Sequence, residues 1–200
     1  HQRLILPQLG ATGIAAHEIK RRTGFSVEYG PVRSEDVKAY LKTDKASEEM
    51  REVRPSIADR AVLVPVELVG SFLYMLGAGI LFYFLGGWLA AFAAVSAFLA
   101  GSVLFPLLLP WIPTRDFSSK GFILGGLVAL GFALAIFFLT PDVVWWMRLS
   151  NSVIYLLLMP PVTAYLALNF TGSTTFTSKT GVRREMFTYI PVMAWLFGAG

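Results

Sequence analysis

Five long apolar runs fill the chain after residue 63, and very few of their residues are charged. They cover about residues 64–85, 88–109, 121–140, 150–169 and 187–200. A helix needs about 20 mostly apolar residues to cross the hydrocarbon core of a bilayer. A buried bundle in a water-soluble protein is the alternative, but runs this long and this poor in charge disfavour it. We therefore predict an α-helical bundle of five transmembrane helices over residues 63–200, with the last span incomplete.

Charged residues are concentrated at the other end of the chain. Of the 17 Lys and Arg residues, eleven lie before residue 61, as do nine of the 13 acids. This segregation predicts a polar head over residues 1–45, a solvated connector over 46–62 and a membrane domain after it. The net charge of +4 does not indicate nucleic-acid binding, because the basic residues are mixed with acids or lie in loops between spans. We expect the lipid bilayer, and no nucleic acid, as a partner.

The loops between the apolar runs alternate in charge. Those around Arg115 and Arg183 are basic, whereas the Gly86-Gly87 turn is uncharged and Asp142 offsets Arg148 in the remaining loop. Positively charged loops remain in the cytoplasm. The pattern predicts a multi-pass protein of the cytoplasmic (inner) membrane with its head in the cytoplasm.

A transport function has little support in the spans. Glu67, near the start of the first span, is the one candidate for an intramembrane ionisable group. Pro160-Pro161 is expected to interrupt the fourth span, which we interpret as a kink repaired by neighbouring helices. Gly121 and Gly125 form a GxxxG pattern, which indicates close helix packing. We interpret the membrane domain as an anchor or docking platform.

The head has the pattern of one α/β unit. A strand at 4–7 is followed by a loop at 8–13, a helix at 14–23 closed by Gly24, a strand at 25–29 and a helix from Ser34 to 41. Parallel α/β sheets bind ligands at the carboxyl ends of their strands, here residues 8–13 and 30–33. Gly10 and Gly13 would let a large ligand approach the backbone, although they could equally serve only the turn. Two strands cannot bury an adequate core, so we expect further strands upstream.

Other features limit the chemistry available to the head. The chain has no cysteine, which excludes a disulfide, a thiolate metal site or a cysteine nucleophile within these residues. His17 has no second histidine or cysteine near it in the sequence, so we interpret it as solvated or as flanking a cofactor. The chain begins at His1 without an initiator Met and ends within an apolar run. We interpret both ends as cut.

Several segments resemble a known family. The head resembles the corrinoid-binding domain of the corrinoid iron–sulfur proteins of the acetyl-CoA pathway and of the mercury-methylating corrinoid (HgcA) family. Only the latter joins such a domain to five membrane spans. The matching segments are Leu6-Pro7-Gln8-Leu9-Gly10-Ala11, His17-Glu18-Ile19-Lys20, Arg22-Thr23-Gly24-Phe25, Tyr29-Gly30-Pro31-Val32-Arg33, Pro113-Thr114-Arg115-Asp116-Phe117-Ser118 and Asn169-Phe170-Thr171-Gly172-Ser173.

The resemblance implies part of a Rossmann-like corrinoid-binding domain that holds a cobalamin-type cobalt corrinoid. It implies methyl transfer from the methyl-corrinoid to inorganic Hg(II), a ferredoxin-like iron–sulfur reductant and a methyl-folate-type donor. The family's axial cobalt ligand is a cysteine in an Asn-Val-Trp-Cys-Ala-Ala-Gly-Lys motif, which is absent here. We expect that ligand upstream, assign no catalytic residue, and expect these 200 residues alone to be inactive. The positions carried over as the far wall of the corrinoid pocket are Gln8, Leu9, Gly10, Ala11, Thr12, Gly13, His17, Gly30, Pro31, Val32 and Arg33.

Two other functions remain open. The first is a membrane-tethered methyl carrier of one-carbon metabolism, which would load a corrinoid but be inert toward Hg(II). The second is a noncatalytic membrane protein that keeps a relic corrinoid-like head, which would bind no corrinoid at all.

Overall fold

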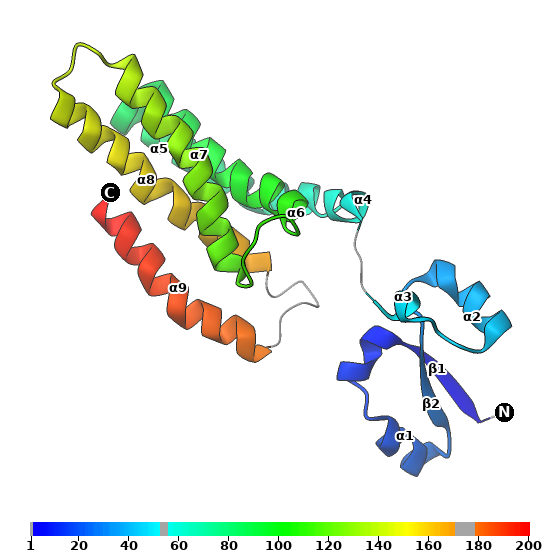
Figure 1. The fold of residues 1–200 in the computed structure, drawn as a ribbon. Coiled ribbons are helices and arrows are strands. Elements are labelled where there is room, and N and C mark those ends of the chain that lie inside the picture. The colour runs from blue at the N-terminus through cyan, green and yellow to red at the C-terminus, as the bar shows by residue number, and fades with distance from the viewer. Residues whose placement is uncertain (1, 53–55, 171–178) are drawn as a thin grey trace. The chain divides into compact units, whose positions relative to one another are not determined.

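The structure, a computed structural model, describes residues 2–52, 56–170 and 179–200 (Figure 1). The chain forms two compact units, His1–Pro55 and Ser56–Gly200. The boundary between them lies within the predicted connector 46–62. Within that connector, short helices form at α3 (Glu48–Arg51) in the first unit and α4 (Ile57–Ala61) in the second. Each of these helices begins at a serine cap, Ser47 or Ser56.

The head contains the predicted strand–helix–strand unit. Strands β1 (Arg3–Pro7) and β2 (Ser26–Gly30) are parallel, with Arg3 opposite Ser26 and Pro7 opposite Gly30. Helix α1 (Ala16–Thr23) connects them and ends at Gly24, which has φ 76° and donates its N–H to Lys20 O at 3.0 Å. The predicted glycine cap is confirmed, because only glycine adopts this left-handed backbone at little cost. The described residues form a two-stranded sheet, so the Rossmann-like domain stays a prediction.

Two local details of the head differ from the prediction. Residues Gln8–Thr12 form the 3-10 helix η1 rather than an open loop. Ser34 is not the cap of a helix, because Ser34–Asp36 is itself a 3-10 turn (η2) that leads into α2 (Val37–Thr43). The helix α2 carries the best-buried aromatic residue of the head, Tyr40, which is 1% exposed.

The second unit begins with a helical hairpin. The helix α5 (Val64–Leu99) is broken at Gly87, where φ is 76° and ψ is −166°. A Cβ on Gly79 would lie 3.2 Å from Cγ2 of Val95. In one straight helix these two residues would be separated by about 24 Å, so the chain reverses at Gly87. The tight turn predicted at Gly86-Gly87 is therefore confirmed.

The return limb of the hairpin continues without a loop into a π-helix and a last helical turn. These are η3 (Ala100–Leu104) and α6 (Phe105–Leu108). Ala100, Gly101 and Ser102 are buried. A Cβ on Gly101 would lie 2.6 Å from Cβ of Leu166, so the π-helix packs against the fourth apolar run.

Helices α7 (Phe117–Leu139) and α8 (Trp145–Asn169) form an antiparallel pair at the centre of the unit, and α9 (Lys179–Ala199) packs on α8 (Figure 1). Pro160 and Pro161 do not interrupt α8, which is continuous across both prolines, so the predicted break is wrong. Close to the prolines, the hydroxyl of the fully buried Thr163 donates to Ala97 O at 3.1 Å and joins α8 to α5.

The predicted close packing at the GxxxG pattern is present between α7 and α8. A Cβ on Gly121 would lie 2.6 Å from Cα of Ala164, and one on Gly125 would lie 2.8 Å from Cα of Pro160. These neighbours are backbone atoms, which cannot rotate away as a side chain can. The two helices can therefore approach this closely only with glycine at both positions.

Three helical stretches in the described part of the chain are long and apolar enough to cross a membrane. They are Ile57–Leu108, Phe117–Leu139 and Trp145–Asn169. These stretches indicate a membrane protein. The first one contains the reversal at Gly87, and helix α9 is not among the three.

Two adjacent glycines of α7 provide a matched test of this packing. We expect Gly125→Ala to destabilise the unit by about 1–3 kcal/mol, because the added methyl overpacks the contact with Pro160. Gly126→Ala should leave the free energy of unfolding unchanged or raise it slightly, since no atom lies within 4 Å of the added Cβ and alanine favours a helix. Thermal unfolding of both variants in detergent micelles measures the difference. Equal stability of the two variants would contradict the contact.

Candidate functional site

The predicted ligand-binding segments leave the sheet at one edge. Because β1 and β2 are parallel and Pro7 pairs with Gly30, η1 and residues 31–33 both begin at the carboxyl ends of the strands. The helix η1 also contacts β2. The structure thus brings the two predicted segments together, as the parallel topology requires.

Two positions on this edge could still contact a ligand: Gln8 has an unpaired hydrogen-bond acceptor, and Gly13 has open space beside its backbone. The side-chain oxygen of Gln8 is buried and has no hydrogen-bond partner in residues 2–52, 56–170 and 179–200. A buried acceptor without a donor is uncommon in a folded protein. A Cβ on Gly13 would meet nothing within 4 Å, so open space lies beside that backbone.

The backbone between these two residues is held in place by internal hydrogen bonds. The amides of Gly13 and Ile14 both donate to Gly10 O at 3.1 Å. The Tyr29 hydroxyl donates to Ile14 O at 2.8 Å and ties this segment to β2. The Gly13 amide is therefore already used within the chain, whereas the Gln8 oxygen is not.

The segment after β2 has a different role from the one predicted for it. Gly30 and Pro31 are buried, and a Cβ on Gly30 would lie 3.0 Å from Cγ2 of Ile5 and 3.6 Å from the Tyr40 ring. Val32 donates its amide to Met50 O at 2.8 Å. These residues build the core beneath the edge.

Four of the remaining predicted positions lie at the surface. Leu9, Ala11, His17 and Arg33 are exposed, and Thr12 ends η1. Among the described residues there is no group of three or more His, Cys, Asp or Glu side chains that could hold a metal. His17 on α1 therefore stands apart from any such cluster.

A charged cluster that sequence analysis missed joins α2 to the sheet. Arg3 forms two hydrogen bonds with the Asp44 carboxylate, one of them 3.0 Å long, and an ion pair with Glu28 at 3.2 Å. The hydrogen bond from Arg3 lowers the pKa of Asp44 and raises that of Arg3. Burial, followed by the neighbouring Glu28 carboxylate, raises the pKa of Tyr40. This cluster is structural, because Arg3, Asp44 and Glu28 satisfy one another.

The second unit holds a polar cluster of the same kind. The buried carboxylate of Glu185 on α9 accepts hydrogen bonds from the Ser118 amide at 3.1 Å and the Ser118 hydroxyl at 3.2 Å. Nearby, the Tyr189 hydroxyl donates to Asp116 at 2.9 Å. These contacts cap the first turn of α7 with groups from α9.

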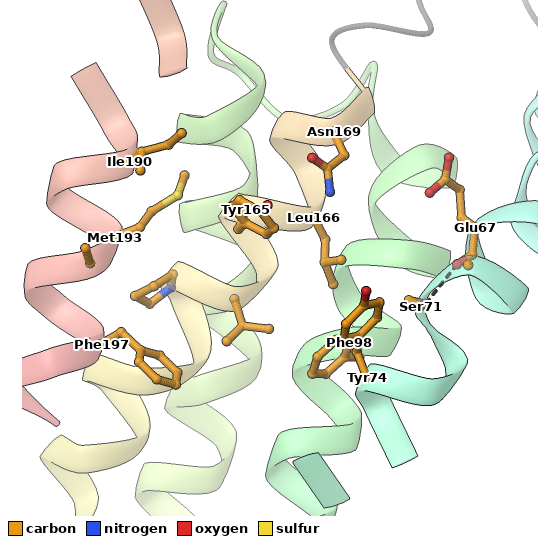
Figure 2. A pocket seen from close by; sticks show the side chains of 14 residues that line it. Glu67, Ser71, Tyr74, Phe98, Tyr165, Leu166, Asn169, Ile190, Met193 and Phe197 are labelled. Atoms are coloured by element: carbon orange, nitrogen blue, oxygen red, sulfur yellow. Dashed lines mark hydrogen bonds between the residues drawn. The ribbon is translucent and has the colours of Figure 1, made fainter. Parts of the chain in front are cut away.

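A cavity of about 780 Å³ lies between α5, α8 and α9. Figure 2 shows Glu67 and Asn169 at one end of it and Phe197 toward the other. Sequence analysis singled out Glu67 but did not predict the cavity, because its walls come from three segments that are far apart in the chain.

Comparison with protein families, with curated proteins and with solved structures finds no match to this chain. The assignment of a function therefore depends on the residues and geometry described above.

Because the Tyr40 hydroxyl is buried and its pKa is raised, we expect the head to lose stability at alkaline pH. Its buried hydroxyl forms no hydrogen bond of good geometry among the described residues, and its pKa is raised above the ordinary value of about 10. The folded state therefore favours the protonated form. Its contribution is complete below the unfolded pKa and is lost as the pH rises from about 10 toward the folded pKa.

We expect cleavage of the head by subtilisin to accelerate in the wild type as the pH rises above about 10, the ordinary pKa of tyrosine. In Tyr40→Phe this acceleration should be smaller, because the ionisable group is gone. At pH 8 the two proteins should be cleaved at similar rates, since the lost hydroxyl has no partner. Identical pH profiles for both proteins would show that Tyr40 is not responsible.

Proposed function

We propose that this chain is the membrane-anchored portion of a corrinoid-dependent methyltransferase that converts inorganic Hg(II) to methylmercury. The proposal is supported by one observation above all. The segments that resemble the mercury-methylating corrinoid family, residues 8–13 and 30–33, meet at one edge of the sheet. On that edge the buried Gln8 oxygen has no hydrogen-bond partner among the described residues, and open space lies beside the Gly13 backbone.

The residues at this edge fit a corrin ring and its side chains. The Gln8 oxygen can accept a hydrogen bond from a corrin side-chain amide, and the space beside Gly13 allows a flat macrocycle to lie against the backbone. The exposed Leu9 and Ala11 supply apolar contact next to them. A bound corrinoid supplies a cobalt-held methyl group that leaves with its bonding electrons toward a soft acceptor such as Hg(II).

The chain's own residues bind and orient in this proposal, and none of them is catalytic. No cysteine is present in the 200 residues, so the axial thiolate belongs to sequence outside them. A ferredoxin-like iron–sulfur protein as reductant and a methyl-folate-type donor are the partners that the family resemblance implies.

Five membrane passes form part of the same proposal. Both limbs of α5 are apolar and antiparallel, α7 and α8 add two passes, and α9 is the fifth. The basic residues Arg115 and Arg183 lie at the ends of the bundle that the positive-inside rule assigns to the cytoplasm, together with the head.

The absence of cysteine makes the topology directly testable. We expect Asp142→Cys to react with a membrane-impermeant maleimide in intact cells, because the loop between α7 and α8 faces outward. Lys45→Cys in the head should react only after the membrane is permeabilised. Labelling of Lys45→Cys in intact cells would contradict the proposed orientation.

Corrinoid binding tests the proposed cofactor. We expect the purified chain in detergent to bind hydroxocobalamin, detected by its visible absorbance after gel filtration. Gly13→Leu should weaken binding about tenfold, because the side chain fills the space beside the backbone. Gln8→Leu should also weaken it, since the acceptor is lost.

Gly131→Leu is the matched control, because Gly131 is also open to added atoms but lies in α7 of the second unit. Failure of the complete protein to bind any corrinoid would favour the noncatalytic alternative. If the complete protein, with its axial cysteine, binds a corrinoid but transfers no methyl group to Hg(II), the one-carbon methyl carrier would be favoured.

A further inference from the structure

The cavity between α5, α8 and α9 has one polar end and one apolar end. Glu67 and Asn169 lie at the end where α5 begins and α8 ends, and Ser71 lies one turn further along α5 (Figure 2). The wall beyond them is mostly apolar and includes Phe98, Leu166, Met193 and Phe197. Such a gradient matches an amphiphile, which carries a polar headgroup and an apolar tail, better than a uniformly polar or apolar ligand.

The size and location of the cavity also fit one segment of a lipid. From Glu67 to Tyr74 along α5, and from Ile190 to Phe197 along α9, the walls extend for about 10 Å. A volume of about 780 Å³ is within the range of small-molecule sites. Tyr74 and Tyr165 line it and are exposed on the surface of the bundle, so the cavity is accessible from the side that acyl chains would occupy.

The charge in the cavity selects the headgroup. Glu67 is its one acidic lining residue, and no Lys or Arg is among the described lining residues. Within the described residues, none of the ion pairs involves Glu67. Ser71 does not compensate the carboxylate either, because its hydroxyl donates to the backbone oxygen of Glu67 at 2.8 Å. An uncompensated carboxylate at a membrane boundary attracts a cation.

The polar groups distinguish between kinds of cation. The Glu67 carboxylate and the Asn169 amide oxygen accept hydrogen bonds, and a primary ammonium group offers three N–H donors. A quaternary ammonium offers none and is held by aromatic cages instead. An anionic headgroup would be repelled by Glu67.

We propose that this cavity is a lipid site that selects a headgroup with a primary ammonium, of the phosphatidylethanolamine type, through Glu67. The ammonium lies against Glu67 and Asn169, and one acyl chain follows the wall formed by Leu166, Met193 and Phe197. The site lies wholly in the second unit and does not depend on corrinoid binding by the head.

Native mass spectrometry of the full chain, released from mixed phosphatidylethanolamine and phosphatidylglycerol micelles, tests the proposal. We expect the wild type to retain phosphatidylethanolamine in preference to phosphatidylglycerol. Glu67→Gln should reduce this preference about tenfold, the amount expected for one charged hydrogen bond. Glu67→Lys should reverse it.

Two further variants separate the site from general membrane effects. Ala194→Phe keeps Glu67 but fills the cavity that Ala194 lines, so it should lose the retained lipid as well. Asp142→Asn removes a carboxylate from the loop between α7 and α8 and should behave as wild type. All variants are compared at equal helical content, measured by far-UV circular dichroism. Unchanged lipid preference in Glu67→Gln, or retention in Ala194→Phe, would overturn the proposal.

Discussion

The second unit depends on the close approach of α7 and α8 at Gly121 and Gly125. With glycine at both positions, the backbone of α7 reaches the backbone of α8 at Ala164 and Pro160. In lipid, helix association is driven by close packing and interhelical hydrogen bonds, because apolar side chains gain little by leaving acyl chains. The helix α8 also contacts α5, η3 and α9. Loss of this contact would therefore affect the walls of the cavity as well as the pair itself.

The polar groups of the bundle are used to hold segments together rather than to present chemistry. Thr163 donates to Ala97, Ser152 donates to Ala133 at 2.8 Å, and Glu185 accepts from Ser118. Each of these bonds joins two different helices, and each is buried, where an unpaired polar group is costly. Glu67 differs from them because its carboxylate has no such partner among the described residues. That difference is the reason to assign it a ligand.

In the head, the location of the candidate site could be predicted from the sequence, but the role of each residue in it could not. The two segments at the strand ends meet because parallel strands place their carboxyl ends at one edge, and this follows from the order of strand, helix and strand. The role of each residue does not follow. Gly30 looked like a ligand-contacting glycine, but it makes room for Ile5 and Tyr40, whose positions depend on how α2 packs. Likewise, Ser34 resembles a helix cap by sequence, yet a 3-10 turn precedes α2.

The sequence by itself determined which segments are helical and apolar, where the hairpin turns at Gly87 and where α1 ends at Gly24. These features depend on local composition and on backbone angles that glycine adopts readily. Only the tertiary structure decided that Gly125 is essential to a contact while its neighbour Gly126 is open, because rotation of α7 about its axis turns one toward α8. It also decided that α8 continues through two prolines, which local sequence rules alone would place at a break. The cavity beside Glu67 exists for the same reason: three segments distant in the chain pack without filling the space between them.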